Sequence, residues 1–282
     1  MNRLYLLTLT IVALPILGSL SSMVNAQIRP LAPPSQHSML DMTFPEFEAA
    51  VARTDVVLVP LGSVEEHGAH LPLSTDAVTS LGQMNLVQGY LRAHDIETIV
   101  GPPLNIGLTS EGHFTKSGTY PYPGSLTIGT DTFVALYVDV LRSLHDKGLN
   151  WAFLYSGHGA PSQGVAMARI AEQASRTIDG MHAYALIPSE SVAAFGLTPS
   201  PWIVPLPNFR NFDLLTSLLG TTADRPTTTH ADGAETSLML FYRPELVRPG
   251  YEQAQTPTST AFRKAAESGT ARTIRVGREV FQ

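Results

Sequence analysis

The chain has 282 residues, of which 44% are apolar, 8% aromatic and 15% charged. This apolar fraction excludes an intrinsically disordered protein, and 22 glycines with 21 prolines are too few for a fibrous one. The net charge is −6 and no basic run occurs, so we expect no nucleic-acid partner. The absence of cysteine excludes disulfides, thiolate metal sites and a cysteine nucleophile. Any metal site must then be built from His, Asp and Glu.

The N-terminus has the features of a secretory signal peptide. A positively charged start precedes an apolar run, Leu4 to Leu20, and Val-Asn-Ala ending at Ala26 is a small-residue cleavage pattern. A membrane anchor is the alternative, although the run is short for a span. We therefore expect a periplasmic or secreted protein with no stable membrane anchor after cleavage. The expected organisation is a signal peptide over 1–26, an extended mature N-terminus over 27–42 and a single domain over 43–282.

Buried strands alternate with amphipathic helices along the rest of the chain. Continuous apolar runs predict strands over 56–61, 96–100, 151–155 and 182–188. Helical periodicity predicts helices over 43–53, 77–93, 130–147, 164–176 and 234–242. No element is predicted over 199–229, and 105–128 is predicted to be a long functional loop. The alternation predicts an α/β fold, a three-layer sandwich around a mainly parallel sheet.

The densest group of chemically active residues follows the first predicted strand. Glu65 and His67 are two residues apart, so an extended backbone projects both to one side, and Asp76 returns after a turn. Open α/β sheets bind their ligands at the carboxyl ends of the strands. Two carboxylates and an imidazole converging there suit a divalent metal ion. The alternative is that each residue is an ordinary loop charge or turn residue.

Two further motifs strengthen the metal-site prediction. His158 follows the strand predicted over 151–155, between two glycines that would let the backbone approach a bound group closely. His230 and Glu235 lie at the start of the last predicted helix, where Glu235 could instead stabilise the helix dipole. Further candidates for contacts to substrate or to the ligand side chains, with ordinary turn roles as the alternative, are Ser63, His70, Ser110 and His113.

The motifs Gly62–Asp76, Gly157–Gly159 and His230–Ser237, in this order, resemble those of the creatininase (creatinine amidohydrolase) family. The resemblance implies a compact α/β sandwich with two divalent metal ions, which are zinc, manganese or iron. It also implies a homo-oligomer such as a hexamer. His230 matches a catalytic histidine that acts in acid–base chemistry or contacts the substrate. The implied metal ligands are Glu65, His67, Asp76, His158 and Glu235, with Asp76 bridging the metals.

The sequence departs from creatininase proper at three positions. Gly159 and Ala160 stand where creatininase has Tyr and Glu, and that Glu is a metal ligand, so Glu235 would have to take its place. Pro226 stands where creatininase has a tryptophan. Because the groups that enclose creatinine are missing, creatinine is not the expected substrate. The family also includes deformylases and a peptidase, usually cytoplasmic, and the export signal argues against both roles.

The expected function is therefore an exported, metal-dependent amidohydrolase. It would cleave the C–N amide bond of a cyclic amide, a formamide or another small amide with a metal-bound hydroxide. His230 would protonate the departing nitrogen. Two alternatives stay open: a periplasmic protein that binds a metal or small amide without turnover, and a single-zinc lactonase or peptidase.

Overall fold

The computed structural model describes residues 38–109, 124–207, 230–231 and 233–251, all within one unit that spans 34–282. The predicted signal peptide lies outside the described residues. The helices are α1 (Phe44–Val51), α2 (Thr75–Arg92), α3 (Thr130–His145), α4 (Pro161–Thr177), α5 (Ser189–Ala194) and α7 (Gly233–Tyr242), with 3-10 turns η2 (Met39–Asp41) and η4 (Pro244–Leu246). The strands are β1 (Val56–Leu61), β2 (Ile99–Val100), β3 (Trp151–Ser156), β4 (His182–Pro188) and β5 (Ile203–Leu206).

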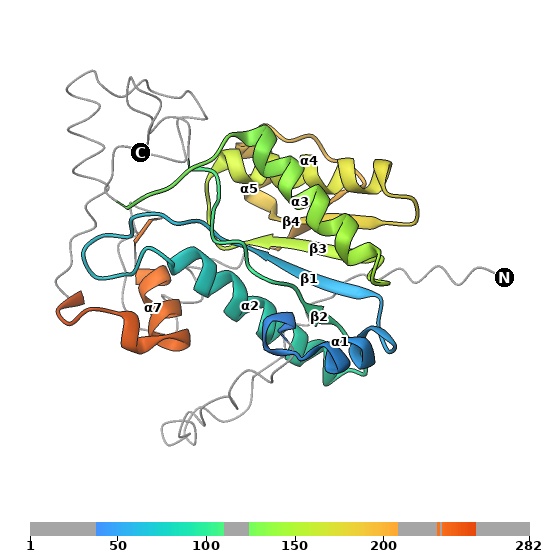
Figure 1. The fold of residues 1–282 in the computed structure, drawn as a ribbon. Helices are drawn as coiled ribbons and strands as arrows, with labels where there is room; N and C mark the ends of the chain where they lie inside the picture. Colours follow the sequence, from blue (N-terminus) through green and yellow to red (C-terminus); the bar gives the residue numbers. More distant parts are fainter. Residues whose placement is uncertain (1–37, 110–123, 208–229, 232, 252–282) are drawn as a thin grey trace, which may run out of the picture. The chain divides into compact units, whose positions relative to one another are not determined.

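The five strands form one parallel sheet in the order β2-β1-β3-β4-β5 (Figure 1). β1 and β3 pair along their whole length, from Val56 opposite Trp151 to Leu61 opposite Ser156. Both strands therefore end at the same level on one edge of the sheet. The residues that follow them are brought together there, which is where open α/β sheets bind ligands.

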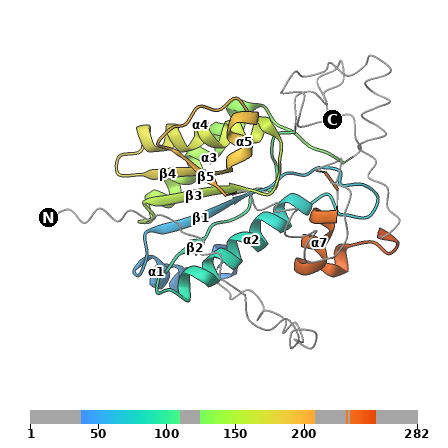
Figure 2. The same cartoon turned by 180° about the vertical axis from the view of Figure 1, so that it is seen from behind.

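Helices cover both faces of the sheet, as Figures 1 and 2 show from opposite sides. Side chains alternate along a strand, so β1 feeds two separate cores. Val57 and Val59 belong to the large core shared with α3 and α4. Leu58 packs with Met84 of α2 and Val100 of β2 in a smaller one. The predicted three-layer α/β sandwich around a parallel sheet is confirmed.

The structure corrects several predicted boundaries. α2 begins at Thr75 and not at residue 77, which places Asp76 in its first turn. α4 begins at Pro161, three residues earlier than predicted, and η2 is a helical turn inside the segment predicted to be extended. The strand predicted over 96–100 contains only two residues, Ile99 and Val100.

β5 lies in the region where no element was predicted. It is a four-residue edge strand, none of its side chains is fully buried, and Pro205 interrupts its apolar run. Short edge strands with proline carry little of the burial pattern on which sequence prediction depends. The neighbouring α5 was missed as well, because six residues are too few to show a helical period.

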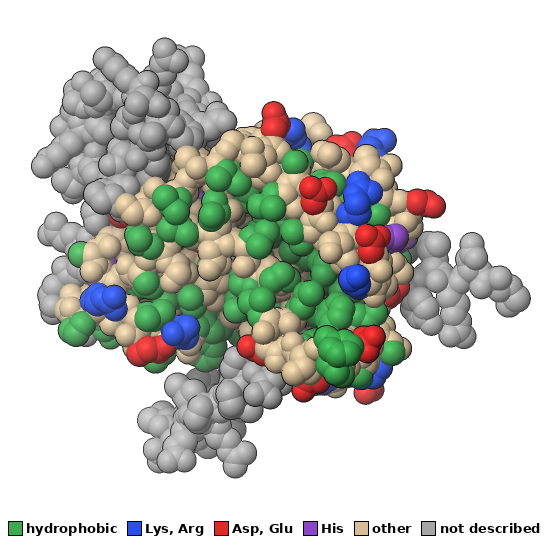
Figure 3. Space-filling view, viewed as in Figure 1, with side chains coloured by type: hydrophobic (Ala, Val, Ile, Leu, Met, Phe, Trp, Pro, Cys, Tyr) green, Lys and Arg blue, Asp and Glu red, His purple; other side chains and the backbone are tan. Residues whose placement is uncertain are grey.

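The molecular surface reflects the low charge content of the sequence. Figure 3 shows apolar side chains across the centre of the face that carries α2 and α3, with charged side chains toward its edges. Leu86 of α2 and Leu136 of α3 are each 41% exposed. Among the described residues, no helix combines the length and the apolar character needed to span a bilayer.

Candidate metal centre

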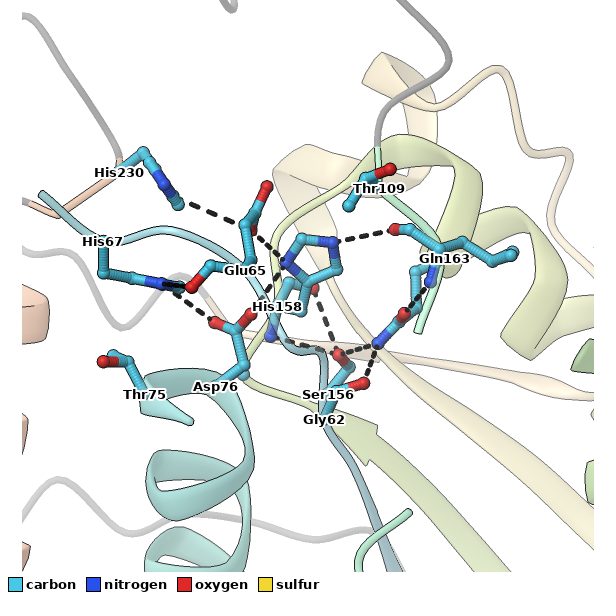
Figure 4. Close-up of polar contacts among 12 residues, drawn as sticks. Gly62, Glu65, His67, Thr75, Asp76, Thr109, Ser156, His158, Gln163 and His230 are labelled. Atoms are coloured by element: carbon cyan, nitrogen blue, oxygen red, sulfur yellow. Dashed lines mark hydrogen bonds and ion pairs between the residues drawn. The ribbon is translucent and has the colours of Figure 1, made fainter. Parts of the chain in front are cut away.

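Four ionisable side chains lie together at the edge of the sheet where β1 and β3 end (Figure 4). Glu65 and His67 follow β1, His158 follows β3, and Asp76 comes from the first turn of α2. Their exposed fractions are 4%, 0%, 7% and 1% in that order. Buried charged groups are stable only when they pair or bind a metal, so the contacts within this group decide its chemistry.

The contacts divide the group into two parts that share Asp76. In one part, His158 Nδ1 lies 2.9 Å from Glu65 Oε2 and 3.0 Å from Asp76 Oδ2. In the other, His67 Nε2 lies 3.2 Å from Asp76 Oδ1 and 3.8 Å from Glu235 Oε2. The ligand atoms of each trio lie within 4.8 Å of one another. Each oxygen of Asp76 thus faces a different imidazole, as a carboxylate that bridges two cations would.

Backbone carbonyls fix the orientation of both imidazoles. His67 Nδ1 lies 3.0 Å from the carbonyl oxygen of Glu65, and His158 Nε2 lies 2.8 Å from that of Leu108. A carbonyl only accepts hydrogen bonds, so these two nitrogens carry the proton and donate. The other nitrogen of each ring is directed at the carboxylates. Metal-binding histidines show this arrangement, because it leaves one lone pair for the metal.

The carboxylates stay ionised despite their burial. Burial would raise the pKa of Glu65, but the facing His158 outweighs it and lowers the pKa to about 2. Burial likewise opposes charge on Asp76, yet His67 and His158 hold its pKa below the usual range. Burial would lower the pKa of His67, but Asp76 raises it to about 10, and Glu65 and Asp76 raise that of His158. Without a cation, protons on the imidazoles balance the carboxylates.

These residues fit a pair of divalent cations. Within the described part of the chain, His67 Nε2 and Asp76 Oδ2 are buried and make no hydrogen bond of acceptable geometry, although they lie close to opposite charges. A cation would satisfy both atoms. Imidazole nitrogen with carboxylate oxygen is a donor set that zinc and manganese accept.

Glu235 and His230 approach the group from the start of α7. The Glu235 carboxylate accepts a hydrogen bond from the Ala231 backbone at 2.5 Å, so it stabilises the helix start and faces His67 at once. The His230 ring lies 4.4 Å from that of His67, and its Nδ1 is 3.9 Å from Glu65 Oε2. Its Nε2 donates to the carbonyl of Glu66 at 2.6 Å. The side chain of His230 is 21% exposed, so it can reach a bound molecule.

The remaining candidates lie in different surroundings. His70 is buried, its Nε2 lies 2.9 Å from Thr236 Oγ1, and burial lowers its pKa. It therefore joins the segment after β1 to α7 and is not one of the grouped ligands. Ser63 is fully buried, and its hydroxyl has no hydrogen-bond partner among the described residues. Ser110 and His113 lie outside the described residues.

The two glycines beside His158 have different surroundings. A Cβ on Gly157 would lie 2.7 Å from Thr79 Oγ1 and 2.9 Å from Ser80 Oγ, both on α2. Gly157 therefore allows α2 to pack against the end of β3, and this packing brings Asp76 to His158. A Cβ on Gly159 would meet nothing within 4 Å.

Two residues at the site were not found by sequence analysis. Glu66, which was not among the predicted site residues, has Oε1 at 3.8 Å from His230 Nε2, and its Oε2 accepts a hydrogen bond from Gly68 N–H. Gln163 is fully buried and bonds to three segments that support the ligands. A polar residue on the buried face of a helix is the one sequence signal that Gln163 gives.

The fold and the grouped side chains define an α/β protein with a candidate two-metal centre at the carboxyl edge of a parallel sheet. The chain belongs to the creatininase family: the sequence profile of that family, described as creatinine amidohydrolase, matches residues 40–278. The predicted family is thereby confirmed.

Two curated relatives match part of the chain. The mycofactocin precursor peptide peptidase of Mycolicibacterium smegmatis is 32% identical over 114 residues, which are 40% of this chain and 43% of that protein. The creatinine amidohydrolase of Pseudomonas putida is 29% identical over 119 residues, 42% of this chain and 43% of that protein. The chain thus matches less than half the length of each of these relatives.

Solved structures support the fold. A tryptophan-to-phenylalanine mutant of creatininase matches 76% of this chain and 75% of its own, with a TM-score of 0.56 and 22% identity. Creatininase structures named as the Mn form and as a Zn–Zn type match with TM-scores of 0.50 and 0.51. At this level of identity the likeness shows a shared fold.

Proposed function

We propose that the protein is a metal-dependent amidohydrolase that cleaves the C–N bond of a cyclic amide, a formamide or another small amide. The observation that carries the proposal is the position of Asp76. Its two oxygens face two imidazoles, at 3.2 and 3.0 Å, and a further carboxylate lies beside each imidazole. The relatives named above act on C–N bonds by their names, which supports the same reaction class here.

Each residue has a distinct role in this proposal. Glu65, Asp76 and His158 would hold one divalent ion, and His67, Asp76 and Glu235 the other. Bound divalent ions polarise an amide carbonyl and lower the pKa of water toward about 7. Since Nε2–H of His230 donates to a backbone carbonyl, Nδ1 is the nitrogen that would accept a proton from the attacking water and pass it to the leaving amine.

The walls of the site favour a substrate other than creatinine. Ala160, at the position of a creatininase glutamate ligand, is buried and offers no ligand atom, so Glu235, whose carboxylate faces His67, would take its place. The side chain of a tyrosine is missing at Gly159, which leaves open space beside His158. We therefore propose a small amide that does not require aromatic enclosure.

We also propose that the protein is periplasmic or secreted and forms a homo-oligomer such as a hexamer. The N-terminal 26 residues support the first part through their charge, apolar run and small-residue cleavage pattern. Membership of the creatininase family supports the second. Cell fractionation with mass determination of the mature N-terminus tests export, and light scattering tests assembly.

The experiment that tests the activity combines metal analysis with a substrate screen. The purified mature chain is assayed on cyclic amides, formamides and small linear amides, before and after chelation and with zinc or manganese restored. We expect two ions per chain and hydrolysis that depends on them. Glu65→Gln should abolish hydrolysis and lower the metal content, whereas Asp131→Asn, whose carboxylate is 93% exposed on α3, should change neither. Metal binding without turnover would favour a binding protein, and one ion per chain a mononuclear lactonase or peptidase.

A further inference from the structure

Gln163, in the first turn of α4, forms a hydrogen-bonded support beneath the metal-binding residues (Figure 4). Its side chain is fully buried. Oε1 accepts a hydrogen bond from Leu108 N–H at 2.8 Å, while Nε2 donates to Ser156 Oγ at 2.8 Å and to the carbonyl of Gly62 at 3.3 Å. One neutral amide therefore connects the end of β1, the end of β3 and the segment at residue 108.

Two of these bonds lead to His158. The carbonyl of Leu108 accepts the hydrogen bond from His158 Nε2 at 2.8 Å. The hydroxyl of Ser156 accepts from the backbone N–H of His158 and donates to its carbonyl, both at 3.1 Å. Gln163 thus acts on the ring of His158 through Leu108 and on its backbone through Ser156.

The backbone packs closely around this amide. A Cβ on Gly107 would lie 2.3 Å from Gln163 Oε1 and 2.6 Å from the carbonyl oxygen of Gly62. The 107–108 backbone therefore packs directly against the amide, which also holds the N–H of Leu108. Loss of the amide would free the group that fixes which nitrogen of His158 is protonated.

We propose that Gln163 is a positioning residue, which makes His158 present Nδ1 and not Nε2 to a divalent cation. This inference rests on the proposed two-metal site. Gln163 would support only the cation that Glu65, Asp76 and His158 would bind. The cation held by His67, Asp76 and Glu235 should not depend on Gln163, because these three hydrogen bonds of the amide, among the described residues, lead to Leu108, Gly62 and Ser156 and not to His67 or Glu235.

The test is the substitution Gln163→Leu, which keeps the volume and removes the three hydrogen bonds. We expect zinc titration of the metal-free protein to show a 10- to 100-fold weaker affinity, roughly the loss seen when the supports of metal ligands are removed. One of the two zinc ions should be affected and the other retained. Nitrogen chemical shifts of the His158 ring should show Nδ1 bound to the metal in the unmodified chain and a mixture in the variant.

Two further variants separate positioning from general stability. Gln88→Leu removes another buried amide, which lies toward the far end of α2 and donates to the carbonyl of Thr98 at 2.7 Å. This variant should lower the melting temperature without changing zinc affinity. Gln163→Glu keeps an acceptor for Leu108 N–H and should bind zinc more tightly than Gln163→Leu. It also carries the test if the leucine variant does not fold.

The outcomes are distinguishable. Wild-type zinc affinity and unchanged ring shifts in the Gln163 variants would overturn this inference and leave the proposed function intact. Equal losses of affinity in Gln88→Leu and Gln163→Leu would also overturn it, since they would show an effect of stability alone. If the unmodified chain bound no zinc and no manganese, both the inference and the proposed function would fail.

Discussion

The two halves of the candidate metal centre are held by the fold in different ways. The half with Glu65 and His158 stands on adjacent strand ends, and Gln163 connects those strands beneath it. The half with His67 and Glu235 depends on α7, which buries only Thr236 and Met239 among its described side chains. Glu235 is 14% exposed, compared with 5% for the side chain of Glu65.

This difference has a thermodynamic consequence. A metal-binding side chain that follows a strand is held in place by the sheet itself. A metal-binding side chain on a docked helix is less firmly held, so part of the cation's binding free energy is spent on ordering that helix. We therefore expect the cation at Glu65 and His158 to bind more tightly than the cation at His67 and Glu235. The predictions below follow from this ranking, from the largest expected effect to the smallest.

Asp76→Asn should have the largest effect, because Asp76 is shared by both halves. The amide cannot bridge two cations, so we expect both affinities to fall by more than about 100-fold and hydrolysis to be lost. Metal content of the dialysed variant, measured by mass spectrometry, checks the result. If one ion were retained at full affinity, Asp76 would not be the shared ligand.

Glu65→Gln and Glu235→Gln should distinguish the metal affinities of the two halves. We expect Glu235→Gln to keep one tightly bound ion per chain, while Glu65→Gln loses the tight site and retains only weak binding. Zinc titration of the two variants side by side measures the contrast. Identical titrations would contradict the ranking of the halves.

Thr236→Val should have a smaller effect, confined to the α7 half. It removes the hydroxyl that pairs with His70 Nε2 at 2.9 Å and should weaken the second ion by about 10-fold or more, at a cost of about 1 kcal/mol in stability. Thr236→Ser keeps the hydroxyl and is the matched control. Loss of the tight ion instead of the weak one would show that α7 supports the whole centre.

An effect without any change of sequence, and with no loss of either cation, is expected from pH in the metal-free protein. The pKa of His67 is raised from 6.5 to about 10, so its protonated form contributes stability that is complete below about pH 6.5 and lost as pH rises through about 10. A bound cation replaces that proton, so the metal-loaded protein should not show this loss. Melting temperatures with and without chelator between these pH values check the prediction, and parallel curves would contradict it.

Sequence patterns were sufficient for most of the sheet and singled out most of the side chains that meet at the candidate site. β1, β3 and β4 are continuous apolar runs, and the motifs that follow β1 and β3 had to meet because parallel strands end at one edge. Asp76 was predicted to follow a turn and to precede the helix, whereas it lies in the first turn of α2, which carries no apolar period. The strand β5 was missed because its four residues carry no strand pattern of their own and are held in a strand by pairing with β4.

Gln163 and Glu66 could not be predicted, for a physical reason. The hydrogen bonds of Gln163 join residues 55 and 101 positions apart, and a neutral amide leaves no charge pattern or spacing in the sequence. Glu66 resembles any loop carboxylate until the fold brings His230 beside it, 164 positions away along the chain. Interactions that depend on such distant pairs become visible only in three dimensions.

The unequal surroundings of the two glycines beside His158 indicate how the substrate range of the proposed amidohydrolase could be engineered. Gly157 touches α2, so saturation mutagenesis there would yield mostly misfolded clones. Gly159 faces free space, and a library at that position could introduce aromatic or polar walls without disturbing the scaffold. Selection for new amides would therefore begin with the second glycine and leave the first untouched.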